Sequence, residues 1–62
     1  MIVKIFRLRE DGERMRSYKV INSVKNIRCT ATGLEFTLSR GFQEIKYEFD
    51  FNGHQYEMEV FP

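Results

Sequence analysis

The sequence has almost none of the residues that build catalytic or metal centres: it contains one cysteine, Cys29, one histidine, His54, and no tryptophan. A single cysteine cannot form an internal disulfide, which excludes a disulfide-stapled secreted scaffold and favours a reducing cytoplasm. A zinc site needs three or four ligands of the Cys and His type, so one is excluded on residue count. No glycine-rich phosphate loop and no nucleophile-elbow motif occurs. We therefore expect a non-enzymatic protein without a cofactor or a small-molecule substrate.

Long hydrophobic runs are also missing. The N-terminal segment MIVKIFRLRE is interrupted by Lys4, Arg7 and Arg9, which argues against a signal peptide. No apolar run approaches the ~20 residues that span a bilayer. Sixty-two residues make a single domain, 1–62, near the lower size limit for independent folding. We expect a complete small cytoplasmic protein that does not contact a membrane.

The net charge of +1 conceals an asymmetry along the chain. Residues 1–31 carry eight Lys or Arg and three Asp or Glu, whereas residues 32–62 carry two Lys or Arg and six Asp or Glu. Such a split can attract an anionic partner to one half or pair neighbouring molecules. It can equally be internal neutralisation.

The C-terminal third has the clearest β-strand pattern. Apolar residues alternate with charged ones through EIKYEFDF, residues 44–51, as in a half-buried strand. Asn52-Gly53 follows, which is the strongest two-residue signal for a type I′ turn. We therefore expect a hairpin about this turn. Its cross-strand pairs would be Phe51 with His54, Phe49 with Tyr56, Tyr47 with Met58, and Ile45 with Val60.

The middle segment NIRCTATGLEFTLS, residues 26–39, alternates in the same way. A two-residue turn at Thr32-Gly33 predicts a second hairpin. Its apolar face would pair Ala31 with Leu34, Cys29 with Phe36, and Ile27 with Leu38. In this position Cys29 is expected to be a small buried core residue.

The N-terminal segment RLREDGERMR, residues 7–16, places four arginines symmetrically about Asp11-Gly12. A two-residue loop at Asp11-Gly12 would put all four on one face, and this is the register we favour. A three-residue loop with a glycine bulge is the alternative. It pairs Arg9 with Glu13 and places Arg14 and Arg16 on the face opposite Arg7 and Arg9.

No segment has sustained helical periodicity, and the chain is predicted to be all-β. About six strands form an antiparallel meander, curled into a barrel or a small sandwich because a flat sheet would leave one face bare and two edges open. The chain should bend from one half to the other within residues 15–30, around NSVKN. Phe36, Tyr47 and Phe49 are expected in the core.

Two binding functions fit this architecture. The arginine-rich hairpin, with Tyr18 on the same face, resembles the basic and aromatic surface of small nucleic-acid-binding barrels. Arginine binds phosphate through two parallel hydrogen bonds and stacks on bases. Glu10, Asp11 and Glu13 lie among the arginines and reduce the positive charge of the hairpin. The anion-binding candidates are Arg7, Arg9, Arg14, Arg16 and Tyr18.

Protein–protein contact is the function that we favour. Phe42 lies in the turn context SRGFQE, and Phe61 falls on the outward, acidic face of the last strand. Exposed aromatic rings framed by charge serve as anchors in interfaces. The partner would be another protein or a second copy of the chain. For the Phe42 ring itself, the arrangement that we favour is one folded back as a plug of the barrel end, and an exposed interface anchor is the alternative. Small chains of this kind are typical of phage and mobile-element products.

Overall fold

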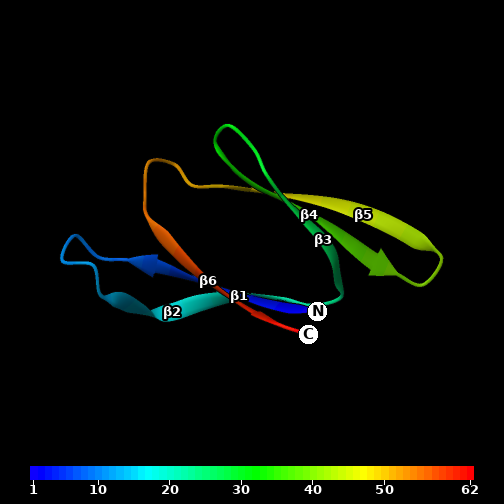
Figure 1. The fold of residues 1–62 in the computed structure, drawn as a ribbon, viewed down its shortest axis with the longest axis horizontal. Coiled ribbons are helices and arrows are strands. Elements are labelled where there is room, and N and C mark those ends of the chain that lie inside the picture. The colour runs from blue at the N-terminus through cyan, green and yellow to red at the C-terminus, as the bar shows by residue number, and fades with distance from the viewer.

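The computed structural model describes residues 1–62 and contains six β-strands and no helix that could cross a membrane. The strands are β1 (Ile2–Leu8), β2 (Arg14–Ile21), β3 (Val24–Cys29), β4 (Gly33–Arg40), β5 (Gln43–Asp50) and β6 (Tyr56–Phe61). They form two antiparallel three-stranded sheets, β2-β1-β6 and β3-β4-β5 (Figure 1). The all-β, antiparallel prediction is therefore confirmed. The predicted barrel or sandwich is not, since no closed barrel forms.

The chain passes from the first sheet to the second through the bend between β2 and β3, as the sequence predicted. Ser23 occupies the left-handed region there, with φ of 60°, which turns the chain sharply. The bend is held to the N-terminus by two hydrogen bonds of 2.9 Å, in which the Met1 ammonium donates to Val24 O and the Val24 N–H donates to Met1 O. The start of β1 is therefore tied to the start of β3.

The predicted pairing of the last two strands is wrong. Asn52 and Gly53 do form the expected type I′ turn, with φ of 51° and 77° and a 2.9 Å hydrogen bond from His54 N–H to Phe51 O. Beyond the turn the strands diverge, and β6 pairs with β1 while β5 pairs with β4. The physical reason is burial. Placing β6 beside β1 splits the meander into two sheets, so that Val3 and Ile5 are covered by the second sheet instead of facing water.

The β3–β4 hairpin has the predicted apolar face but a shifted register. Cys29 lies opposite Leu34 and Ile27 opposite Phe36. The turn closes one residue earlier than predicted, because Thr30 exchanges two bonds with Gly33: its N–H donates to Gly33 O at 2.9 Å and its Oγ1 accepts the Gly33 N–H at 3.0 Å. Gly33 is thus the first residue of β4 and not part of the loop.

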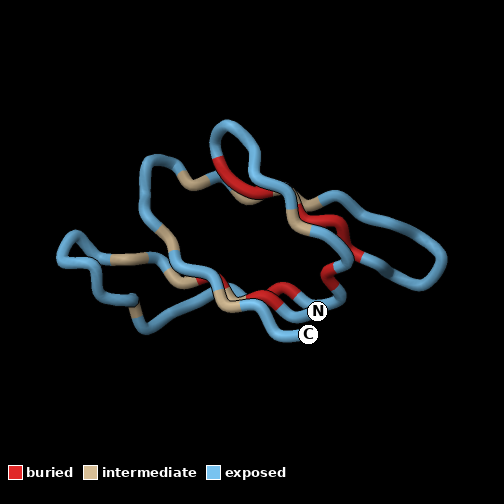
Figure 2. Tube along the Cα trace, in the orientation of Figure 1, coloured by how far each residue is buried: buried red, intermediate tan, exposed pale blue.

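The hydrophobic core lies between the two sheets (Figure 2). Phe36 and Val3 are completely buried, but the predicted core residues Tyr47 and Phe49 are only partly buried. The accessible surface is 4824 Å², against about 4,250 Å² expected for this mass. The radius of gyration is 12.3 Å, against roughly 10.6 Å expected for this length. The molecule is therefore more open than a closed domain of its size. The buried residues are Val3, Ile5, Ile21, Val24, Leu34, Phe36 and Leu38, with Gly33 and Thr37 beside them.

Candidate functional site

The tip of the β1–β2 hairpin has the alternative register, and the favoured two-residue loop is wrong. The Arg9 N–H donates to Glu13 O at 2.8 Å, and the Gly12 N–H donates to Arg9 O at 2.9 Å. Gly12 takes the left-handed conformation, with φ of 88°, as a glycine bulge requires. Asp11 adds an Oδ1 acceptor for the Glu13 N–H at 3.0 Å, which stabilises the three-residue loop.

A second irregularity separates the arginines further. The register shifts between Phe6, which lies opposite Tyr18, and Leu8, which lies opposite Arg14. Because side chains alternate along a strand, Arg14 projects on the face of Phe6 and Leu8, and Arg7 on the other face. The four arginines therefore do not share one face.

Arg14 is neutralised within the molecule. Its guanidinium donates to Glu57 at 2.7 Å and also to Glu59, both on β6, two strands away across the sheet. It also lies 4.3 Å from the centroid of the Phe6 ring. The hydrogen bonds to Glu57 and then to Glu59 raise the pKa of the Arg14 guanidinium. Arg14 thus joins β2 to β6 and is not free for an anionic partner.

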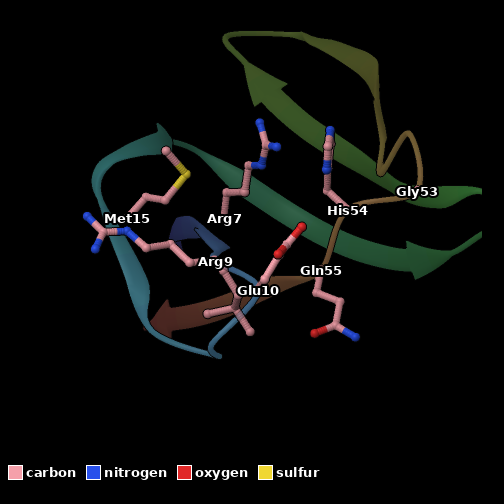
Figure 3. A pocket seen from close by; sticks show the side chains of 8 residues that line it. Arg7, Arg9, Glu10, Met15, Gly53, His54 and Gln55 are labelled. Atoms are coloured by element: carbon pink, nitrogen blue, oxygen red, sulfur yellow. The ribbon is translucent and has the colours of Figure 1, made fainter.

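Arg7 and Arg9 line a surface depression of about 540 Å³ between the β1–β2 tip and the loop that precedes β6. Figure 3 shows the side chains of Arg7 and His54 pointing in the same direction, while that of Arg9 runs toward Met15. A 2.8 Å hydrogen bond from Leu8 N–H to Gln55 O holds the two segments together. Neither Arg7 nor Arg9 takes part in an ion pair, nor does Arg16.

Tyr18 and Phe61 lie on the outer face of the β2-β1-β6 sheet. The Tyr18 ring is 5.0 Å from that of Phe6, and Phe61 lies opposite Ile2 on the neighbouring strand. The Lys4 ammonium stands between the two candidate rings, 5.0 Å from the centroid of Tyr18 and 5.5 Å from that of Phe61. Lys4 cannot be singled out from the sequence, because its place between these rings depends on the β1–β6 pairing.

Phe42 occupies the tip of the β4–β5 hairpin. Arg40 lies opposite Gln43, so the loop consists of Gly41 and Phe42. Phe42 is fully exposed, at 110 % of its reference accessible surface. The favoured prediction that Phe42 plugs the end of a barrel is therefore wrong: the ring is exposed and the chain forms no closed barrel.

Cys29 is exposed, which corrects the expectation that it is a buried core residue. Although it alternates in phase with Ile27, it is the last residue of β3, an outer strand of its sheet. No group of three or more His, Cys, Asp or Glu side chains lies close enough together to hold a metal ion.

The chain matches no protein-family model, and no curated protein sequence or solved structure matches it significantly. Function is therefore inferred from the surfaces described above.

Proposed function

We propose that this protein is a small non-catalytic binding module that docks onto another protein through the tip of the β4–β5 hairpin. The observation that carries the proposal is the complete exposure of Phe42. Burying an aromatic ring removes roughly 150–250 Å² of surface from water, and rings of this kind serve as central anchors of interfaces. An uncovered ring at a protruding tip can insert into an apolar pocket without any rearrangement of the module.

The fold itself does not need a ring at this position. Gly41, with φ of 62°, provides the left-handed conformation that the first central residue of a two-residue hairpin loop requires. The second central position is occupied by Phe42, which takes part in none of the aromatic pairs of the structure. A small polar residue would satisfy the turn equally well, so the ring is explained by recognition better than by folding.

The surroundings of Phe42 also suit an interface. Arg40 flanks the tip on one strand, and on the other the Glu44 carboxylate accepts a 2.6 Å hydrogen bond from Lys25 on β3. An apolar anchor with a polar, solvated rim is the usual anatomy of a protein–protein contact. We expect a partner with an apolar pocket edged by polar groups.

A Phe42→Ser variant tests the proposal. We expect it to melt at the wild-type temperature, because the ring is fully exposed, and to lose capture of the partner by tagged protein in cross-linking experiments. Excess untagged wild type should compete for the captured partner, and excess Phe42→Ser should not. Phe61→Ser, which removes a less exposed ring on the other sheet, is the matched control and should retain capture.

Retention of capture by Phe42→Ser would refute the assignment of this tip as the docking surface. Light scattering on the wild type and on Phe42→Ser identifies the case in which the partner is a second copy. Association of the wild type that is lost in the variant would support the proposal, with self-association as its form.

A further inference from the structure

Three depressions on the surface follow one another along β2. The first lies beside Asn22 and Arg40, the second beside Ser17 and Tyr56, and the third is the depression at the hairpin tip that Arg7 lines. Lys19 lines both the first and the second, and Arg7 lines both the second and the third. Each depression therefore shares a side chain with the next, and the surface that the three make up is called here the basic groove.

The basic groove follows the open seam between the two sheets. In the first two depressions β2 supplies most of one wall, and the opposite wall includes Tyr47 and Phe49 of β5 together with residues of β4 and Tyr56 of β6. Both β2 and β5 are outer strands of their sheets. In a closed barrel such edges would pair. Here the Lys19 side chain crosses the seam instead, and its ammonium lies 4.7 Å from the centroid of the Tyr47 ring and 6.0 Å from that of Phe49.

The groove is lined by four of the six Lys and Arg side chains that form no ion pair; the other two, Lys4 and Arg16, lie outside it. Its lining includes the four cationic side chains of Arg7, Arg9, Lys19 and Arg40, and a single carboxylate, that of Glu10. None of these four cations belongs to an ion pair. The cations that are paired, those of Arg14, Lys25, Arg28 and Lys46, do not line the groove.

Aromatic rings lie between these cations. Tyr47, Phe49 and Tyr56 are each partly buried, so part of each side chain remains open to the solvent. The rings of Phe49 and Tyr56 meet edge to face at 5.1 Å. Lys19, over Tyr47 and Phe49, places a positive charge directly beside the exposed aromatic surface.

We propose that the basic groove binds a single-stranded nucleic acid, with phosphates on the four cations and unpaired bases against the rings. A charged groove lined with aromatic side chains is the general solution for holding single strands, because every base has a face that can stack. A duplex hides its base faces and would use only the charges. This site shares one end, Arg7 and Arg9, with the arginine-rich hairpin expected from the sequence, but it excludes Arg14. It does not depend on the docking role of Phe42.

The test measures fluorescence anisotropy of a labelled single strand of about 12 nucleotides, within the range of site sizes of small single-strand-binding domains. Full contact with four phosphates predicts a slope of log K against log salt of about −3. Arg7→Gln and Lys19→Ala should each reduce the magnitude of the slope by about 0.7. Tyr47→Leu should weaken binding about tenfold through lost stacking, with the salt slope unchanged.

Arg28→Gln is the charge-matched control, because it also removes one cation but lies outside the groove. We expect it to retain both the wild-type affinity and the wild-type slope. Circular dichroism melts confirm that each variant is folded, and Arg7→Gln and Arg40→Gln carry the test if a substitution at Lys19 or Tyr47 unfolds the chain.

Several results would overturn the proposal. One is the absence of binding at low salt, and another is equal loss of affinity in Arg28→Gln and the groove variants. Equal affinity for a duplex of the same length would show that bases are not contacted. Competition by polyaspartate as effective as that by unlabelled single strand would show a general polyanion surface, or one suited to an acidic protein.

Discussion

Replacing Gly33 with alanine tests the β4–β5 register directly. A Cβ at this position would lie 2.0 Å from the Phe49 carbonyl oxygen and 3.0 Å from the Cα of Asp50. Both atoms belong to the β5 backbone, so the clash is relieved only by moving the strand and not by rotating a side chain. Overpacking costs typically 1–3 kcal/mol. Because the backbone must give way here, we expect a loss of about 3 kcal/mol or more in the free energy of unfolding.

That loss is large for so small a domain. A chain of this length has a total stability of roughly 3–9 kcal/mol, and 1 kcal/mol shifts the Tm by about 4–8 °C. Gly33→Ala should therefore lower the Tm by roughly 12 °C or more, measured by circular dichroism. Gly41→Ala is the control: no atom lies within 4 Å of its Cβ, and its left-handed φ costs about 1–2 kcal/mol. If Gly33→Ala melted no lower than Gly41→Ala, the register that places Gly33 opposite Asp50 and next to the Phe49 carbonyl would be wrong.

Three further outcomes are expected. Phe36→Ala, at a fully buried ring, should cost about 3–5 kcal/mol and leave little folded protein in a chemical-denaturation titration. Arg14→Ala should lower the Tm at low salt and less so at high salt, whereas Arg16→Ala should leave the Tm unchanged, because only Arg14 pairs with β6. The hydrogen bond and the charge of Lys25 lower the pKa of Glu44 below its ordinary 4.5, so this pair stabilises the fold above that pH and ceases to do so as the pH falls through the lowered value. The Tm difference between the wild type and Lys25→Met should therefore be present at neutral pH and vanish in acid; a difference that persisted in acid would assign the effect to packing of the Lys25 side chain.

The face on which each side chain lies could be predicted from the sequence, but the register could not. Alternation with a period of two fixes which residues point to the same side of a strand. This is why Ile27 and Phe36 were correctly placed on one face. The register depends on where a turn closes, and at Thr30 a hydroxyl group competes for the Gly33 N–H. The sequence pattern indicates a turn role for Gly33, whereas the close approach of the β5 backbone is what requires a glycine there.

The turn at Asn52-Gly53 shows how a correct local prediction can accompany a wrong global one. The type I′ geometry follows from two residues that tolerate positive φ. Whether the flanking strands then pair depends on competition with every other strand edge in the chain. In the structure β6 pairs with β1, with Met58 opposite Ile5 and Val60 opposite Val3. Tyr56, Met58 and Val60 still share the face predicted for them, because the alternation along β6 is independent of its partner.

The single face predicted for the four arginines is wrong for the same reason. The symmetry of RLREDGERMR suggests a shared face, but the sequence contains no signal for the register shift between Phe6 and Leu8. The pairing of β6 with β1 then brings Glu57 and Glu59 within reach of Arg14, so the charge of that arginine is not available to an anionic partner.

The same rearrangement leaves Arg7 beside the seam that Lys19 crosses. Lys19 and Tyr47 are 28 positions apart and lie in different sheets, so their contact could be recognised only once the strands were assigned to sheets. The acidic residues of β6 thus neutralise Arg14 on the outer face, whereas Arg7, Arg9, Lys19 and Arg40, which form no ion pair, line the basic groove.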